Sequence, residues 1–335
     1  MKQYLSEIVE GRDLSQSAMG EAFDLIMSGE ATPAQIGAFI ASLRVKGETA
    51  EEIAGAASSM RRHAVFIDAA GAPVIDTCGT GGDKCDTFNV STTAAFVAAG
   101  AGVPVAKHGN RAISSKCGSA DLLAELGVNI EADQATVEEC VQETGIGFLY
   151  APRLHPAMKY AMTPRRELGI RTIFNMLGPL TNPAGARSQI IGVFSPDLTE
   201  PFAEVLKLLG SRKAFVVHGH DGMDEITTTT TTRISELRDG RIRTYDFDPV
   251  NLIGDYSGSD DLRGGEASVN AGISRGVLSG EKGPARDIVC LNAAAAISAG
   301  GKCDDISEGW KLAQESVDSG SAERKLEELI KATAS

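Results

Sequence analysis

The pattern of apolar and polar positions changes near residue 70. Before that point the apolar residues recur at helical spacing, and one stripe at i, i+3, i+4 and i+7 consists of Ile36, Phe39, Ile40 and Leu43. Residues 32–35 (T-P-A-Q) and 49–52 (T-A-E-E) have the form of helix starts, with a hydroxyl cap and a Gln or Glu three residues later. Residues 1–70 are therefore predicted to form a small all-helical domain.

From residue 73 onward, short β-like runs alternate with helical segments, which predicts a mostly parallel central sheet flanked by helices. The β-like runs are residues 73–75, 103–106, 128–130, 146–150, 189–194, 214–217 and 242–245. Residues 156–185 interrupt the alternation with two predicted helices, and we expect these to join the helical domain. The larger α/β domain then comprises residues 73–155 and 186–335.

A glycine-rich loop follows the first of these strands. Residues 76–83 read D-T-C-G-T-G-G-D, and residues 91–99 are predicted to form a helix directly after the loop. Free N–H groups and the helix dipole make such a junction favourable for an anion, which predicts a phosphate site. The sequence does not match G-x-x-x-x-G-K-[ST] or G-x-G-x-x-G. The alternative is a tight turn without a ligand, although Asp83 suits a sugar hydroxyl or a divalent metal.

Three further clusters carry candidate chemistry. Residues 107–111 (K-H-G-N-R) follow a predicted parallel strand, where ligands commonly bind, and an ordinary polar turn is the alternative. Arg165, Arg166 and Arg171 offer guanidinium groups for a carboxylate, unless they form ordinary surface ion pairs.

The third cluster, residues 218–225 (H-G-H-D-G-M-D-E), follows the strand predicted at residues 214–217. Its oxygen-rich end, Asp224 and Glu225, fits Mg²⁺, and a surface acidic turn is the alternative. The two histidines, His218 and His220, lack a third ligand in a zinc pattern.

Composition narrows the class of protein. The net charge of −13 disfavours general binding to nucleic acid or to an anionic membrane. No apolar run approaches the ~20 residues of a membrane-spanning helix, and no signal peptide is visible at the start. The six cysteines show neither C-x-x-C pairs nor zinc spacing. We expect a cytoplasmic protein with reduced thiols.

Together these motifs resemble the nucleoside phosphorylase-like family of class III phosphoribosyltransferases. The matching segments, in the order of the family, are residues 79–83, 87–92, 107–111, 171–183 and 221–225. The resemblance implies a small helical domain joined by hinges to a larger α/β domain. It also implies transfer of the phosphoribosyl group of phosphoribosyl pyrophosphate (PRPP) to the amine of anthranilate in tryptophan biosynthesis, with release of pyrophosphate.

The resemblance implies a role for each matching residue. PRPP would contact Gly79, Thr80, Gly81, Gly82, Asp83, Thr87, Asn89, Ser91, Thr92 and Lys107. Anthranilate would contact Gly79, His108, Asn110, Arg165 and Pro179. Mg²⁺ would be held by Ser91, Asp224 and Glu225, and no residue is assigned as a general base. Lys84 stands where the family has a small residue, so it would add a cation near the pyrophosphate or point to solvent.

The resemblance also implies a homodimer formed through the helical domain, with no nucleic-acid or membrane partner. Two alternatives remain open. A pyrimidine nucleoside phosphorylase of the same fold would use phosphate and a nucleoside, and would not need the pair Asp224 and Glu225. A non-enzymatic paralogue would bind nucleic acid, which the −13 charge and the presence of Arg165 and Asn110 disfavour.

Overall fold

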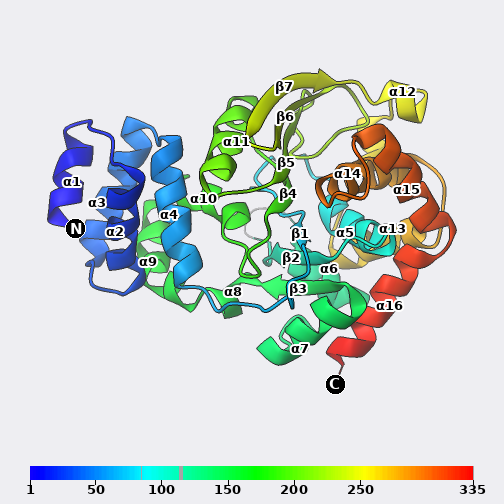
Figure 1. Ribbon diagram of the computed structural model, residues 1–335, viewed down its shortest axis with the longest axis horizontal. Helices are drawn as coiled ribbons and strands as arrows, with labels where there is room; N and C mark the ends of the chain where they lie inside the picture. Colours follow the sequence, from blue (N-terminus) through cyan, green and yellow to red (C-terminus); the bar gives the residue numbers. More distant parts are fainter. Residues whose placement is uncertain (84, 113–115, 335) are drawn as a thin grey trace.

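The computed structural model describes residues 1–83, 85–112 and 116–334, so Lys84 lies outside the described residues. A helical bundle occupies one end of the molecule and a larger α/β part the other, with the N-terminus on the bundle (Figure 1). The bundle contains α1 (Lys2–Val9), α2 (Gln16–Met27), α3 (Pro33–Lys46) and α4 (Ala50–Arg62). The two predicted helix starts are confirmed, because Thr32 and Thr49 both form complete capping boxes.

The chain returns to the bundle after the third strand of the sheet. Helices α9 (Lys159–Leu168) and α10 (Phe174–Leu177) share a hydrophobic core with α2, α3 and α4, through Ala161, Phe174 and Leu177. Figure 1 shows α9 beside the N-terminal helices, which are far from it in sequence. The exact boundaries of the two domains stay a prediction.

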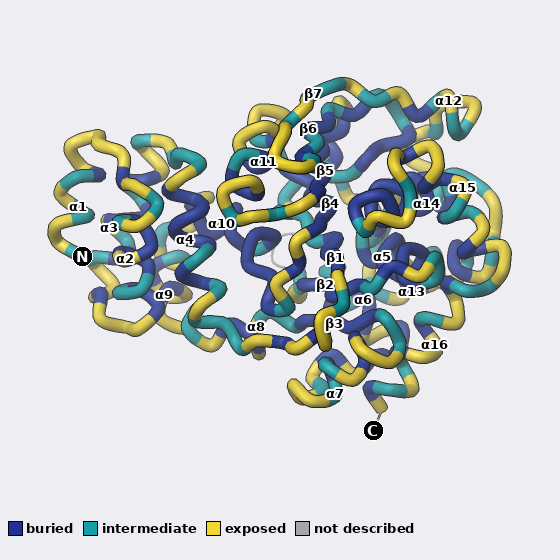
Figure 2. The backbone as a smooth tube through the Cα atoms, in the orientation of Figure 1, coloured by how far each residue is buried: buried dark blue, intermediate teal, exposed yellow. Residues whose placement is uncertain are grey.

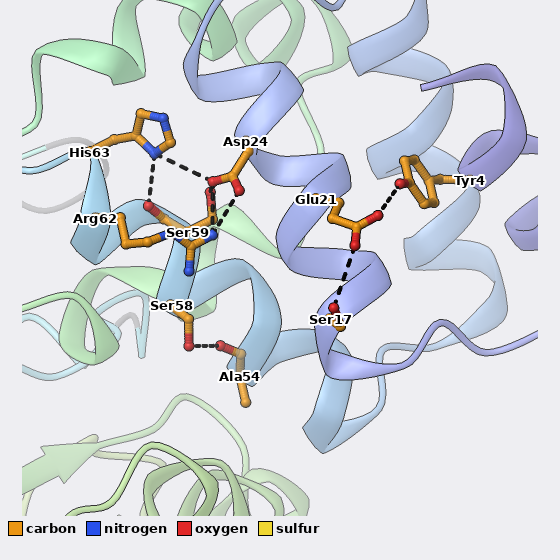
Figure 3. Close-up of polar contacts among 9 residues, drawn as sticks. All are labelled: Tyr4, Ser17, Glu21, Asp24, Ala54, Ser58, Ser59, Arg62 and His63. Carbon is orange, nitrogen blue, oxygen red and sulfur yellow. Dashed lines mark hydrogen bonds and ion pairs between the residues drawn. The ribbon is translucent and has the colours of Figure 1, made fainter.

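Helices α2 and α4 pack closely because small residues face each other. A Cβ on Gly55 would lie 2.3 Å from the backbone oxygen of Gln16. Polar side chains join the same two helices at their exposed side (Figure 3): Ser59 Oγ donates to Asp24 Oδ1 at 2.6 Å, and Arg62 Nη2 donates to both Asp24 oxygens at 2.9 and 2.8 Å. These contacts hold α2 and α4 together within the bundle.

One seven-stranded sheet, of order β3-β2-β1-β4-β5-β6-β7, forms the centre of the α/β part. In this order, β3 to β5 are parallel to one another, whereas β6 and β7 join by antiparallel pairing. The predicted mostly parallel sheet is therefore confirmed. The strands are β1 (Ile75–Asp76), β2 (Val105–Gly109), β3 (Ile146–Tyr150), β4 (Ser188–Gly192), β5 (Lys213–Gly219), β6 (Thr232–Arg238) and β7 (Arg241–Phe247).

One predicted strand is absent from the structure, one observed strand is not predicted, and β2 continues through residues 107–109, which are predicted to follow the strand. Residues 128–130 are not a strand: Val128 and Ile130 are buried by packing in the connection between two helices. Strand β6 is not among the predicted strands, and it begins at the last residue of the threonine run 227–232. The other threonines of this run form a loop in which Thr227 and Thr228 are buried.

Alternating side chains of β5 enter two different cores. Ala214 and Val216 pack into the core that contains α11 (Thr199–Leu208) and the bundle. Phe215 and Val217 pack into the core formed by α5 (Val90–Gly100) and α14 (Pro284–Ala299). Both faces of the sheet are therefore covered, and the buried residues run through the middle of the molecule (Figure 2).

The remaining helices surround these cores. They are α6 (Ser119–Leu126), α7 (Gln134–Glu139), α8 (Ala151–Leu154), α12 (Val250–Ile253), α13 (Ala267–Leu278), α15 (Ile306–Asp318) and α16 (Ser321–Thr333). None of the helices in the described part of the chain combines the length and the apolar character needed to span a membrane.

Candidate functional site

The glycine-rich loop joins β1 to α5 and is tied to the end of β4. Gly81 and Gly82 have φ of +65° and +83°, a conformation that side chains other than glycine rarely adopt. Gly79 is constrained differently, because a Cβ there would lie 3.1 Å from the oxygen of Gly192. That same oxygen accepts hydrogen bonds from the backbone N (2.8 Å) and Oγ1 (3.2 Å) of Thr80.

Gly192, at the end of β4, allows the loop after β5 to approach. A Cβ on Gly192 would lie 1.5 Å from the backbone oxygen of Asp224, so only glycine fits this position without a backbone shift. The sequence pattern does not single out Gly192, since it appears there only as a break in an apolar run. Its packing brings the glycine loop and the acidic loop to the same edge of the sheet.

Three carboxylates, those of Asp83, Asp224 and Glu225, lie at this edge, although their oxygens are not all within 4.8 Å of one another. The backbone N of Asp224 lies 3.5 Å from Asp83 Oδ2, and the backbone N of Ser91 donates to Glu225 Oε1 at 3.1 Å. Burial, followed by the charge of Asp83, raises the pKa of Asp224; burial, followed by the charge of Asp224, raises the pKa of Glu225. Such a group of oxygen donors fits a hard divalent cation that relieves their repulsion.

Lys107 supplies a buried positive charge next to this centre. Its side chain is 3% exposed, and Nζ donates to the backbone oxygen (3.3 Å) and Oγ1 (3.0 Å) of Thr77. Neither partner is charged, and no ion pair joins Lys107 to another described residue. An ammonium group has three donors, so one remains for an anionic ligand.

The structure gives other predicted PRPP residues contacts within the protein. Asn89 precedes α5, and its amide donates to the oxygen of Cys117 (3.1 Å) while Oδ1 accepts from Asn270 (2.9 Å). Thr87 forms an isolated β-bridge with Arg263, and Thr92 is buried in the first turn of α5. These residues shape the loop and the start of the helix.

Asp76 organises the ends of β1 and β2. Its Oδ1 accepts from the backbone N–H groups of Cys78 and His108, both at 3.1 Å, and Oδ2 accepts from Asn182 Nδ2 at 2.8 Å. Within the described residues, Asp76, Cys78 and His108 are the one group of three potential ligands whose atoms lie within 4.8 Å of one another. Hydrogen bonds already occupy the carboxylate and both ring nitrogens, so we interpret the group as structural.

His108 lies in a chain of hydrogen bonds with a second buried histidine, His155. Nδ1 of His108 lies 3.1 Å from the oxygen of Gly178, which only accepts, so this nitrogen carries the proton. Its Nε2 then accepts from Nε2 of His155 at 3.2 Å. Burial lowers the pKa of His108 to about 4 and that of His155 to about 3, so both rings are neutral at physiological pH. The sequence offers no signal for His155.

Two arginines belong to the segment that returns to the bundle. The Arg165 guanidinium, on α9, lies 5.0 Å from the ring of Phe174, and burial lowers its pKa. No hydrogen bond or ion pair to another described residue involves its guanidinium, which leaves it available for a carboxylate. Arg171 Nη2 donates to the oxygen of Gly82 at 2.7 Å, which links this segment to the glycine loop.

The remaining predicted anthranilate residues lie at the same end of the sheet. Pro179 is buried in the 3₁₀ turn η3 (Gly178–Leu180), next to the partner of His108. Asn110 is exposed after β2, and its Oδ1 accepts from the N–H of Arg111 at 2.8 Å. No hydrogen bond to another described residue involves its amide nitrogen, which leaves this donor available to a ligand at the end of that strand.

Comparison with known proteins adds independent information. The chain matches the helical bundle domain of the glycosyl transferase family over residues 2–64 and the a/b domain of the glycosyl transferase family over residues 71–323. It is 58% identical to the anthranilate phosphoribosyltransferase of Desulfosudis oleivorans over 334 residues, covering 99% of this chain and 98% of that protein. The corresponding protein of Acetivibrio thermocellus is 56% identical, covering 100% and 97%.

Solved structures show the same similarity. Anthranilate phosphoribosyltransferase (TrpD) from Thermus thermophilus superimposes with a TM-score of 0.94 at 41% identity, covering 99% of each chain. Anthranilate phosphoribosyltransferase from Saccharomyces cerevisiae, in complex with PRPP and Mg, gives a TM-score of 0.88 at 31% identity, covering 99% of this chain and 97% of that chain.

Proposed function

This chain belongs to the anthranilate phosphoribosyltransferases, and from that premise we propose that it transfers the phosphoribosyl group of PRPP to the amine of anthranilate. The products are N-(5-phosphoribosyl)anthranilate and pyrophosphate, in tryptophan biosynthesis. The observation that carries the proposal is the edge of the sheet at which Lys107 and the three carboxylates surround one glycine loop. The S. cerevisiae relative, solved with PRPP and Mg, supports the same pair of ligands here.

PRPP binds along the glycine loop in this proposal. The backbone of residues 79–82 and the ammonium of Lys107 hold its phosphates, and Ser91 and Thr92 complete the pocket. The N–H of Thr80 takes no part, because it already donates to Gly192 O. Asp83 lies against the ribose and its pyrophosphate. Thr87 and Asn89 contribute by shaping the loop, because their contacts are with other parts of the protein.

Ser91, Asp224 and Glu225 would hold Mg²⁺. The backbone N–H of Ser91 already fixes one oxygen of Glu225, which orients that carboxylate for a metal. When bound, the cation neutralises charge that develops on the leaving pyrophosphate. The raised pKa values of Asp224 and Glu225 fit this role, since a cation between the carboxylates favours their ionised forms.

Anthranilate binds between α9 and the ends of β2 and η3. The guanidinium of Arg165 takes its carboxylate, and Asn110, His108, Pro179 and Gly79 line the pocket. His108 lines the pocket and does not act as a general base, because both of its ring nitrogens are hydrogen-bonded, one to Gly178 and the other to His155.

The chemistry requires positioning more than proton transfer. As pyrophosphate leaves, C1 of the ribose takes on oxocarbenium character, and the amine attacks from the opposite face. The amine loses its proton after attack, so a strong base is not needed. The protein lowers the barrier by holding both substrates in line and by placing fixed charges around them. Arg165 belongs to a helix of the bundle, so a hinge motion of the bundle would close the site against water.

We further propose a homodimer formed through the bundle. Val9 on α1 and Val45 on α3 are 66% and 89% exposed, and Figure 1 shows both helices in the bundle at one end of the molecule. Exposed apolar side chains favour association. All six cysteines are free, in agreement with the expected reduced thiols, and a cytoplasmic location remains a prediction.

The test is a comparison of two reactions. Purified protein with Mg²⁺ is incubated either with PRPP and anthranilate or with pyrimidine nucleosides and inorganic phosphate, and products are separated by chromatography. We expect N-(5-phosphoribosyl)anthranilate and pyrophosphate in equal amounts from the first mixture and no free base from the second. Free base from nucleosides, without transfer to anthranilate, would replace the proposal with a nucleoside phosphorylase.

A further inference from the structure

Three consecutive carbonyl groups of η3 each accept a hydrogen bond from a side chain of a different element. The donors lie on β2, β4 and α4, and the pairs are His108 Nδ1 with Gly178 O at 3.1 Å, Gln189 Nε2 with Pro179 O at 2.7 Å, and Arg61 Nε with Leu180 O at 2.7 Å. A turn this short has little hydrogen bonding of its own, and Pro179 has no N–H to contribute. The side chains therefore set the orientation of the turn.

Among the described residues, the side chains of Arg61 and Gln189 form no hydrogen bond other than the one to η3. Gln189 is buried, and its Oε1 has no hydrogen-bond partner. Nη2 of Arg61 is likewise buried without a partner, and no ion pair to the described part of the chain compensates its charge. Buried polar atoms without partners destabilise a fold, so an apolar side chain would serve better if only packing mattered. The role of these two side chains is therefore to donate hydrogen bonds to Pro179 O and Leu180 O.

Arg61 also connects the two parts of the molecule. It lies in the last turn of α4, in the bundle, whereas η3 leads directly towards β4 of the sheet. Gln189 holds the same turn from β4 itself. The position of Pro179 is thus fixed relative to the sheet by one donor, and its neighbour Leu180 is fixed relative to the bundle by the other.

We infer that Arg61 and Gln189 are positioning residues for anthranilate: they hold the η3 turn so that Pro179 forms the wall of the anthranilate pocket. The inference rests on the proposed function, in which Pro179 contacts anthranilate. Neither side chain needs to touch a substrate. Removing either donor lets the turn rotate, which weakens binding of anthranilate while the PRPP site, built on the glycine loop and Lys107, stays unchanged.

The experiment uses Arg61→Met and Gln189→Met, which keep the length of each side chain and remove the donor. We expect the KM for anthranilate to rise about tenfold in each variant, the equivalent of one lost hydrogen bond, while the KM for PRPP stays within about twofold. Arg61→Lys retains a cation that can donate one bond to Leu180 O, so it should recover part of the loss. The matched control is Arg275→Met, which removes a similar bond, from Arg275 Nη2 to Leu126 O at 2.8 Å, between α13 and α6.

Either an equal rise in both KM values, or an anthranilate effect no larger than that of Arg275→Met, would overturn the inference. If Gln189→Met does not fold, Arg61→Met and Arg61→Lys decide the matter alone. The wild-type protein is assayed in parallel. Absence of transfer by the wild type would refute the proposed function, whereas transfer by the wild type with unshifted variants would refute only the role of Arg61 and Gln189.

Discussion

Nε2 of His155 lies 3.2 Å from Nε2 of His108, and both rings are buried at the end of β2. Only one of these nitrogens can carry a hydrogen, because two N–H groups would point at each other. The pair therefore has one arrangement in the neutral state, with His155 as donor and His108 as acceptor. Adding a proton to the acceptor destroys this arrangement and places a charge in a buried site.

The histidine pair predicts sensitivity to acid. The folded pKa values of about 4 and about 3 lie below the usual 6.5, so the unfolded chain binds these protons more readily. The neutral pair contributes its full stabilisation above pH ~6.5, and this stabilisation is lost as the pH falls towards the pKa values of the folded state. We expect the free energy of unfolding, measured with urea from pH 7.5 to about 4.5, to fall less steeply with pH in His155→Gln than in the wild type. Because one titrating group is removed, the slopes should differ by up to ~1.4 kcal/mol per pH unit. Identical slopes would contradict the assignment.

Arg165→Ala should weaken anthranilate binding selectively. The lost bond is charge-assisted, so we expect the KM for anthranilate to rise by about 10- to 100-fold, with the KM for PRPP nearly unchanged. Initial rates at varied concentrations of each substrate provide the measurement. Arg166→Ala is the matched control, since Arg166 is exposed on the same helix. Comparable effects on the two substrates would exclude the assigned contact.

Replacing Asp224 with Asn and Glu225 with Gln in one protein should abolish Mg²⁺-dependent turnover. The variant should remain folded without metal, because the neutral amides relieve the repulsion that raises the two pKa values. Turnover and melting temperature are measured with PRPP, with and without Mg²⁺. Mg²⁺ should raise the melting temperature of the wild type and not that of the variant. If turnover of the variant depends on Mg²⁺ as it does in the wild type, neither residue binds the metal.

Val45→Asp should shift a dimer towards the monomer. A charge at this exposed position, near the end of α3, would be buried without a partner in the proposed interface. Sedimentation velocity gives the mass, and circular dichroism verifies the fold. Val269→Asp, on α13 and 51% exposed, is the control that should leave the mass unchanged. A monomeric wild type, or a dimer unaffected by Val45→Asp, would argue against an interface on the bundle.

Features with local chemical causes can be predicted from the sequence. The caps at Thr32 and Thr49 need only residues within one turn, and β3 coincides with the predicted strand at residues 146–150. The glycine loop is recognisable because positive φ at Gly81 and Gly82 requires glycine. The prediction that Lys107 lies near this loop agrees with its bonds to Thr77, although Lys107 lies within β2 and not after it.

Features that depend on distant contacts leave no local signal. Gly192 is needed only because Asp224 packs on it, and His155 matters only because it meets His108. The error at residues 128–130 has a similar origin, since a buried connection and a strand show the same apolar pattern. Strand β6 is not predicted, because its charged residues Arg233, Glu236 and Arg238 are also typical of an exposed loop.

The most direct test of the proposed activity is the loss of anthranilate fluorescence on mixing the protein with PRPP, followed with and without Mg²⁺. We expect a steady loss that requires protein, PRPP and Mg²⁺ together. Unchanged fluorescence with folded protein and intact PRPP would contradict transfer to anthranilate, and loss at the same rate without Mg²⁺ would contradict the metal site at Asp224 and Glu225.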